Sequence, residues 1–357
     1  MRIKVVIPVV TLVLAGSVAF AQSVSIGVLG LFRPQQLMLT APGGSALTLH
    51  AGERSFVLEK SSGIDLAHIR RSGDAIILEV GSQIVQTSEV TVTGRDGSPV
   101  VFLLAVPRRI SRRYRGTLQV RAVSETLVAT VGIDLESAVA SVVAAETTAD
   151  VPLEALKAQA IAARSYLVAG KGRHHNFDFC DTTHCQFLRE PPTPGIPAAK
   201  AALDTRGLVM VYESHPFAAM YTRSCGGRTR TPAELGLPTA TYPYYSVDCK
   251  FCREHPPRWQ SRIFAQDAPA LHRSDESARL GVARRLGWNT VQSNDFTMKR
   301  DGERVILQGT GRGHGIGLCQ SGAKAMAQDG ASFRQILNHY YPNTTIVALG
   351  HEVASIH

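Results

Sequence analysis

The sequence of 357 residues has little cysteine, little aromatic content and, beyond residue 21, no hydrophobic run long enough to cross a membrane. Six cysteines are too few for a scaffold built from disulfides, so any group of them points to local chemistry. Charged residues make up 19% and hydrophobic residues 44%, which excludes a disordered or collagen-like chain. The composition is that of a globular protein with room for two domains and a large core.

Acidic residues are also scarce relative to basic ones, since 29 Asp and Glu against 38 Lys and Arg give a formal net charge of +9. Such an excess suits an acidic partner. Composition alone leaves three candidates for that partner: nucleic acid, an anionic membrane surface and a polyanionic glycan.

The first 21 residues have the pattern of a secretory signal peptide. Arg2 and Lys4 precede an apolar run over residues 5–15, and Ala-Phe-Ala at 19–21 has the small-x-small form of a cleavage site. The run is too short for a membrane span, and no cysteine follows the cleavage site to carry a lipid anchor. We therefore predict a protein exported to the periplasm, the cell wall or the medium. It is expected to have no transmembrane segment after cleavage and no nucleic-acid partner.

The β-rich pattern of residues 22–110 predicts a small accessory domain. Its apolar or alternating runs are separated by turn clusters and lie at 25–29, 46–49, 75–80 and 100–104. Five arginines within residues 108–115 fit either a solvated linker or a strip that contacts phosphate or carboxylate groups. A strand over 116–123 then opens a second, mixed α+β domain over residues 111–348, so the predicted fold class is α+β.

A helix is predicted between residues 150 and 170. Apolar residues recur at spacings of three and four along one stripe: Leu153, Leu156, Ala160, Ala163 and Leu167. Asp150 is the expected N-cap, Pro152 fits the first turn, and Gly170 is the expected stop. Lys157 and Arg164 are two turns apart, so they share one face of this helix.

Glu146 ends the apolar run over residues 142–145, just before this helix. Apolar surroundings disfavour the charged form of a carboxylate, which raises its pKa and suits it to donate a proton near neutral pH. An exposed glutamate at the end of a structural element is the alternative. This segment alone does not decide between the two.

Potential metal ligands are dense within twelve residues, at His174, His175, Cys180, His184 and Cys185. Thiolate and imidazole are the preferred ligands of zinc, and the density of histidines favours a metal site here. A disulfide between Cys180 and Cys185 is the alternative in an exported protein. We refer to residues 173–186 as the Cys/His loop.

The other four cysteines give a weaker pattern. Cys249 and Cys252 form a CxxC pair, which fits a structural disulfide or half of a metal site better than a redox motif, because no thioredoxin-like pattern surrounds it. Cys225 and Cys319 are left over, and a bond between them has no support in the sequence.

Residues 309–317 carry glycine at every second position, after an expected strand over 304–308. All five glycines have odd numbers, so the offset of five in a dinucleotide-binding fingerprint is excluded, and no Gly-Lys-Ser/Thr follows. Glycine at every second position leaves one face of a strand without side chains, so a large ligand or another backbone can approach that face. Arg312 and His314 are expected on the opposite face.

Together, several motifs resemble the SpoIID/LytB domain family, which includes stage II sporulation protein D and the LytB amidase enhancer. The matching segments follow the family's order over residues 110–348: RRYRG at 112–116, VVAAE at 142–146, EALKAQAIAARSY at 154–166, CDTTHCQ at 180–186, YTRSCGG at 221–227, GHGIGLCQSGA at 313–323 and ILNHYYP at 336–342. Each motif is weak alone, but the ordered set is highly specific. The chain departs from the family at Cys225 and Cys319, where the family often has serine.

The resemblance implies a lytic transglycosylase that cleaves the glycan strands of peptidoglycan, especially strands stripped of stem peptides. It implies that Glu146 is the catalytic residue. The substrate-binding residues that it implies are Lys157, Arg164, Tyr221, Ser224, His314 and Gln320. It also implies a zinc ion with a structural or site-organising role, held by Cys180, His184, Cys185 and His174. A cell-wall amidase is a further partner that the family name implies.

The chemistry read from the residues agrees with this resemblance. Hydrolytic glycosidases usually need two carboxylates, and the only candidates to join the glutamate are Asp150, Asp178 and Asp181, if they fold back. A lytic transglycosylase needs one, which protonates the glycosidic oxygen and then accepts the proton of the muramic acid C6 hydroxyl, leaving a 1,6-anhydro-muramyl end. Lys157 and Arg164 would bind the lactyl carboxylates. Two rival hypotheses are a non-catalytic enhancer that binds glycan, and a zinc hydrolase whose Cys/His loop does the chemistry.

Overall fold

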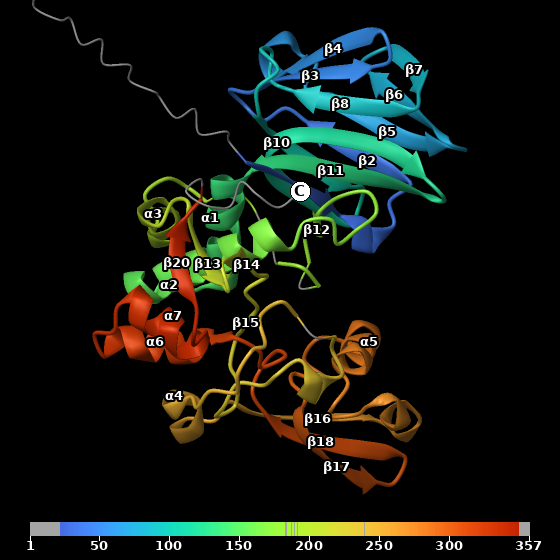
Figure 1. Ribbon diagram of the computed structural model, residues 1–357. Helices are drawn as coiled ribbons and strands as arrows, with labels where there is room; N and C mark the ends of the chain where they lie inside the picture. The colour runs from blue at the N-terminus through green and yellow to red at the C-terminus, as the bar shows by residue number, and fades with distance from the viewer. Residues whose placement is uncertain are drawn as a thin grey trace, which may run out of the picture.

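The computed structural model describes residues 22–349, except for residues 183, 187, 189, 191 and 239. The predicted signal peptide, residues 1–21, lies outside the described residues. The described part has a mixed α+β fold, with a large curled sheet at one end, helices in the middle and a small three-stranded sheet at the other end (Figure 1). No helix within these described residues has the length and apolar character that crossing a membrane requires.

The large sheet has twelve strands and is built mainly from antiparallel hairpins. Buried and solvent-facing residues alternate along most of its strands, as a sheet with one face on a core requires. Eleven strands come in chain order: β1 (Ser23–Val28), β2 (Gln36–Thr40), β3 (Ala46–Ala51), β4 (Arg54–Glu59), β5 (Leu66–Ser72), β6 (Ala75–Val80), β7 (Gln83–Thr87), β8 (Glu89–Thr93), β9 (Val100–Val106), β10 (Ile110–Val123) and β11 (Thr126–Asp134). The twelfth, β12 (Phe179–Cys180), belongs to the Cys/His loop and runs parallel to β1. Two short 3-10 turns, η1 (Gly30–Phe32) and η2 (Lys60–Ser62), lie between strands.

Strand β10 continues the sheet at the point where the sequence predicts a domain boundary. It pairs with β9 up to Gly116, and from Thr117 onward it pairs with β11 and β8. Gly116 permits this change of partner, because a Cβ there would lie 2.3 Å from the carbonyl oxygen of Gly132. The β-rich part therefore extends to Asp134, and its core continues into the first helices. The structure does not set residues 22–110 apart as a module of their own.

The arginine-rich segment forms the β9–β10 hairpin, so it is not the linker that its composition allowed. Arg108 lies in the turn, with a φ of 58°. Arg113 and Arg115 face solvent from the strand, whereas Arg112 turns inward and forms an ion pair of 2.7 Å with the buried Asp181. This pair fastens the Cys/His loop to β10.

Three helices pack below the sheet and against one another, namely α1 (Leu135–Glu146), α2 (Leu153–Ala169) and α3 (Pro197–Asp204) (Figure 1). Helix α1 begins directly after β11, where the carboxylate of Asp134 accepts a hydrogen bond from the backbone N–H of Ser137 at 3.0 Å. The predicted helix between 150 and 170 is confirmed as α2, with Gly170 as its C-cap. Its N-cap is Pro152, whereas the predicted cap, Asp150, pairs with Lys324.

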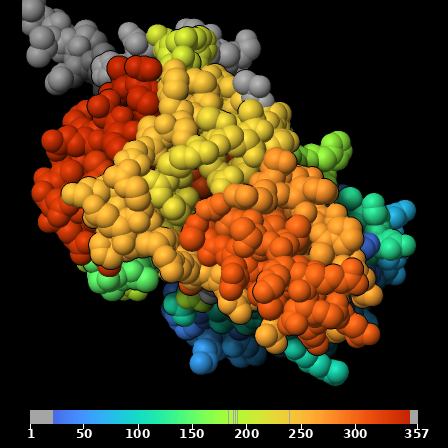
Figure 2. All heavy atoms as spheres, turned by 90° about the horizontal axis from the view of Figure 1, so that it is seen from below, coloured from blue at the N-terminus to red at the C-terminus, as the bar shows by residue number. Residues whose placement is uncertain are grey.

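The rest of the chain forms two smaller units. Next to α2, a three-stranded sheet of β13 (Leu208–Tyr212), β14 (His215–Pro216) and β20 (Thr345–Ala348) joins α6 (Gln320–Gln328) and α7 (Phe333–Tyr340). Farther away, a second sheet of β16 (Arg258–Phe264), β17 (Asp295–Asp301) and β18 (Arg304–Thr310) packs with α5 (Glu276–Leu286) around a small core of its own. From below, this lobe (orange) lies beside the yellow and gold segments that precede it (Figure 2). The connecting segments contain β15 (Tyr221–Thr222), η3 (Ala233–Leu235), α4 (Lys250–Glu254), η4 (Ala265–Ala270) and β19 (Leu318–Cys319).

Candidate functional site

Glu146 is the last residue of α1 and is half-buried where the chain turns toward α2. The end of a helix carries partial negative charge from its unpaired carbonyl groups, which disfavours a second negative charge at that point. The structure thus places the predicted catalytic glutamate at the C-terminal end of a helix.

Tyr221 lies beside Glu146, where the two main hydrophobic cores meet. Burial, and then the nearby charge of Glu146, raise the pKa of Tyr221 well above its usual value, so the phenol stays protonated. Its hydroxyl oxygen is buried and has no hydrogen-bond partner among the described residues. Tyr221 is therefore a protonated phenol within electrostatic range of the carboxylate.

The three aspartates considered as a second carboxylate are each tied to another element. Asp178 accepts hydrogen bonds from the backbone N–H and the hydroxyl of Ser25, at 2.9 and 2.8 Å. Asp181 is buried against Arg112, and Asp150 is paired with Lys324, which lowers the pKa of Asp150 to about 2. None of these three is free to act as a partner of the glutamate.

Lys157 and Arg164 do not present two free cations on one face of α2. Lys157 pairs with Glu154 at 2.9 Å and Asp204 at 3.6 Å, and the hydrogen bond with Glu154 is the main cause of its raised pKa. Arg164 is 0% exposed, and both carboxylate oxygens of Glu136 accept hydrogen bonds from its guanidinium. In this structure the enclosed guanidinium supports the α1–α2 packing, and the substrate-binding role of Arg164 stays a prediction.

Ser224 and Gln320 are also turned toward the protein. Ser224 is buried, and its hydroxyl oxygen lies 3.3 Å from the sulfur of Cys252. Gln320 is half-buried at the start of α6, and its side-chain amide donates to the amide oxygen of Gln159 on α2 at 3.4 Å. Both residues hold elements around Tyr221 together, and their predicted contact with substrate remains a prediction.

The glycine run is a loop rather than the strand that its pattern indicated. Strand β18 ends at Thr310, and the glycines from 311 to 317 all have positive φ values between 70° and 96°. The loop lies directly against the segment that follows β14, since a Cβ on Gly317 would lie 1.9 Å from the carbonyl oxygen of Met220. The predicted close approach of another backbone is therefore confirmed. The glycines permit it because their backbone is in the left-handed region, and not because they form one face of a strand.

His314 is held inside this loop by its own backbone. The backbone N–H of Ile316 donates to Nδ1 of the ring at 3.0 Å. Burial lowers the pKa of His314, so the ring is neutral near pH 7, and the backbone of Tyr221 lies within hydrogen-bonding reach of it. The structure thus brings His314 close to the backbone of Tyr221, and the substrate-binding roles of both residues stay predictions.

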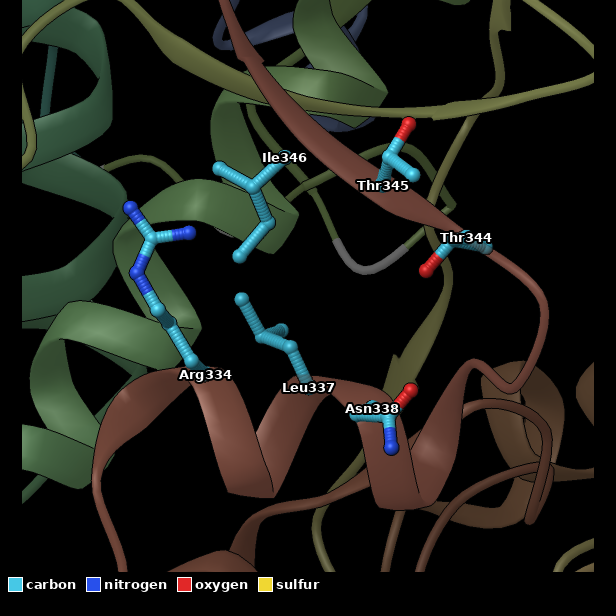
Figure 3. Close-up of a pocket in the computed structure, with 6 residues that line it drawn as sticks. All are labelled: Arg334, Leu337, Asn338, Thr344, Thr345 and Ile346. Atoms are coloured by element: carbon cyan, nitrogen blue, oxygen red, sulfur yellow. The ribbon is translucent and has the colours of Figure 1, made fainter.

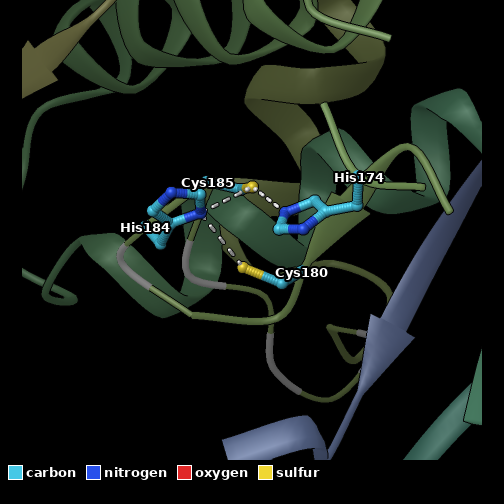
Figure 4. A group of neighbouring side chains, drawn as sticks. All are labelled: His174, Cys180, His184 and Cys185. Carbon is cyan, nitrogen blue, oxygen red and sulfur yellow. Dashed lines mark hydrogen bonds between the residues drawn. The ribbon is translucent and has the colours of Figure 1, made fainter. Parts of the chain in front are cut away.

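The Cys/His loop gathers the four predicted ligands around one point (Figure 4). Their ligand atoms lie within 4.8 Å of one another, and Nε2 of His174 is 3.1 Å from the sulfur of Cys185. Nδ1 of His184 is 3.6 Å from that sulfur and 3.8 Å from the sulfur of Cys180. Zinc–ligand bonds of about 2.0–2.3 Å in a tetrahedron require ligand separations of this size, so the arrangement fits a single ion. His175 is exposed and lies outside the group.

The four remaining cysteines form a second group that the sequence did not predict. Their sulfurs also lie within 4.8 Å of one another, and all four residues are buried: Cys225, Cys249, Cys252 and Cys319. The signal in the sequence was the CxxC pair together with two unassigned thiols, but no spacing connected them.

One surface pocket of about 340 Å³ lies away from these residues, between α7 and β20 (Figure 3). It is lined by Arg334, Leu337, Asn338, Thr344, Thr345 and Ile346. None of the predicted site residues lines it, so it does not enter the candidate site.

Comparison with known proteins identifies the domain. The family model described as stage II sporulation protein (SpoIID) matches residues 123–212, which include Glu146, Tyr166 and the Cys/His loop. An uncharacterized protein of Brachyspira hyodysenteriae is 27% identical over 267 residues, which cover 66% of this chain and 72% of that protein. Stage II sporulation protein D of Bacillus amyloliquefaciens is 27% identical over 260 residues, or 60% of this chain and 74% of the relative.

A shorter match is to an amidase enhancer. The amidase enhancer of Bacillus subtilis is 43% identical over 63 residues, which cover 18% of this chain and 9% of the enhancer. The two relatives with assigned names and the domain match agree with the order of motifs in the sequence. These matches support the SpoIID/LytB family for this chain.

Proposed function

We propose that this protein is a peptidoglycan lytic transglycosylase that uses Glu146 as its single acid and base. The names of its relatives are consistent with a cell-wall function. The observation that supports the finer proposal is the placement of Glu146 at a helix end beside the protonated phenol of Tyr221, with Asp150, Asp178 and Asp181 engaged elsewhere. A site in which the three other candidate carboxylates are bound to other elements suits an internal nucleophile.

The proposed reaction needs no water. The carboxylic acid of Glu146 gives its proton to the glycosidic oxygen as the bond to the anomeric carbon breaks. The C6 hydroxyl of the muramic acid then attacks the same carbon, and the carboxylate of Glu146 accepts the hydroxyl proton. The products are a 1,6-anhydro-muramyl end and a new chain end with a free hydroxyl, and the glutamate is again protonated.

The proposal also has to name the cationic side chains that bind the carboxylates of the substrate. Since Arg164 is enclosed and Lys157 is paired, the lactyl carboxylates require other partners. Arg223 and Arg312 are exposed on the two loops that meet at Ser224, and neither forms an ion pair within the described residues. We assign carboxylate binding to these two arginines.

Digestion of peptide-free glycan strands with the purified protein tests the proposal by the chemistry of the new ends. Mass spectrometry is expected to find 1,6-anhydro-muramyl ends. Reducing ends that disappear with a chelator would instead identify a zinc hydrolase. Retained binding without cleavage would support the enhancer hypothesis, which is favoured by the similarity to the amidase enhancer.

The Cys/His loop is proposed to bind zinc in a structural role. Two cysteines and two histidines are a donor set typical of zinc, and β12 attaches the loop to the edge of the sheet beside β1. The ion would keep the loop folded under β10 and α2, outside the proposed proton-transfer steps.

Replacing Cys180 by serine is expected to remove one equivalent of zinc and to lower the thermal unfolding midpoint. The replacement His175→Ala is the matched control, because this exposed neighbour lies outside the group. Elemental analysis and a thermal scan of the three proteins provide the measurement. Equal zinc content in all three would contradict the assignment of this loop.

A further inference from the structure

We propose that Cys225, Cys249, Cys252 and Cys319 bind one mononuclear metal ion of the zinc type, as a closed structural site. The proposal is independent of the proposed glycan cleavage. It concerns a buried group in the second core of the protein, where the exposed fractions of the four residues are 6%, 2%, 0% and 0%.

The ligands come from three separate segments that converge on one point. Cys225 follows β15 in the segment crossed by the glycine loop, and Cys319 ends β19, which is paired in parallel with β15. Cys249 and Cys252 stand at the N-cap and in the first turn of α4. A CxxC at the start of a helix presents two thiols to the same side, as tetrahedral metal sites require.

The distances fit a single ion. All four sulfurs lie within 4.8 Å of one another, and those of Cys252 and Cys319 are 3.5 Å apart. Four thiolates at a zinc–sulfur distance of about 2.3 Å occupy a tetrahedron with edges of about 3.8 Å. An iron–sulfur cluster would need room between the thiolates for several iron and sulfide atoms, so the compact group favours a mononuclear site.

A backbone N–H and two hydroxyl groups lie within hydrogen-bonding distance of the sulfurs. The backbone N–H of Cys225 donates to the sulfur of Cys319 at 3.3 Å. The hydroxyl of Ser224 lies 3.3 Å from the sulfur of Cys252, and that of Tyr340 lies 3.5 Å from the sulfur of Cys249. Donors placed in this way stabilise the thiolate form and orient the ligands of a metal. The contact with Cys252 also gives the buried Ser224 a structural role.

Gly322 leaves room for the four cysteine side chains. A Cβ on Gly322, in α6, would lie 2.6 Å from the sulfur of Cys249 and 2.0 Å from the hydroxyl oxygen of Tyr340. The helix thus packs directly on the thiols with no side chain between them. With four protein ligands filling a tetrahedron, the ion would have no open position for a substrate, which makes the site structural.

Two disulfides are the competing chemistry in an oxidising compartment. The arrangement favours the metal, because all four sulfurs lie within 4.8 Å of one another, so the group is not divided into two separate pairs. A bound ion would tie together the Ser224 segment, α4 and the junction of the glycine loop with α6. These are the segments that surround Tyr221.

Cobalt substitution and intact mass test the proposal on the full protein. Wild type, purified without chelator and reconstituted with Co²⁺, is expected to show the intense absorption of a tetrahedral four-thiolate complex. Cys252→Ser is expected to lose that absorption and one equivalent of zinc, whereas Cys185→Ser, which alters the Cys/His loop, should retain the absorption.

The wild-type measurements remain decisive if Cys252→Ser fails to fold. An intact mass that shows these four thiols oxidised as two disulfides would overturn the proposal, as would a Co²⁺ spectrum without the four-thiolate absorption. Full alkylation of the four cysteines only after chelation would support it, since a bound ion protects its ligands. Unchanged zinc content in a folded Cys252→Ser protein would also overturn it.

Discussion

Replacing Glu146 by glutamine is expected to slow the cleavage of peptide-free glycan by about 10²–10⁴-fold, the usual contribution of a positioned acid and base. Glutamine keeps the size of the side chain but can neither deliver nor accept the proton. Since Glu146 ends α1 and is only half-buried, we expect the unfolding midpoint to stay close to that of wild type. The rate of appearance of anhydro-muramyl ends provides the measurement.

The matched control for this replacement is Asp150→Asn. Asp150 lies four residues after Glu146, and its side chain is 67% exposed and paired with Lys324. A single-carboxylate mechanism predicts nearly normal cleavage by Asp150→Asn. A comparable loss in both variants would indicate a pair of carboxylates and therefore hydrolysis. Full activity in Glu146→Gln would remove Glu146 from the mechanism.

Replacing Arg164 by methionine is expected to lower the free energy of unfolding by about 3–5 kcal/mol, as is typical when one partner of a buried ion pair is removed. The guanidinium donates to Glu136 at 2.9 and 2.6 Å, and to the carbonyl oxygens of Leu208 and Ala202 at 3.1 Å. Methionine fills similar space but leaves a carboxylate and two carbonyl groups without these donors. Urea unfolding measures the change.

Two further variants separate charge from packing at this site. The double replacement of Glu136 by glutamine and Arg164 by methionine should be less destabilising than the single change, because no uncompensated charge is left. Lys157→Met, on the same helix, should cost less because Lys157 keeps some solvent contact. Normal stability of Arg164→Met combined with weak glycan binding would return Arg164 to the predicted substrate-binding role.

Local patterns predicted the parts of the fold that depend on neighbouring residues. The apolar spacing predicted α2 and its end at Gly170, because a helix buries one stripe set by its own sequence. Helix α1, which ends at Glu146, was not predicted, because the apolar run over 142–145 shows no helical spacing of its own. The N-cap of α2 was missed because Asp150 found a partner in α6, 174 residues away.

Features that depend on distant partners could not be predicted from one sequence. The boundary predicted at residue 110 stays a prediction, and the sequence could not indicate that β10 exchanges β9 for β11 within a single strand. Arg164 was expected at a surface because its partner, Glu136, belongs to another helix. The four-cysteine group spans 94 residues between Cys225 and Cys319, so no local spacing could indicate it.

The pairing of β1 determines the order in which the large sheet can be completed. Ser23 lies opposite Asp134, and the other edge of β1 is covered only by β12, at residues 179–180. A chain that folds as it emerges from its N-terminus therefore holds its first strand unpaired until more than a hundred further residues are available. A fragment that stops before β11 leaves both edges of β1 open, and open edges recruit other chains. Truncation before residue 126 should thus produce aggregates rather than a shorter folded sheet.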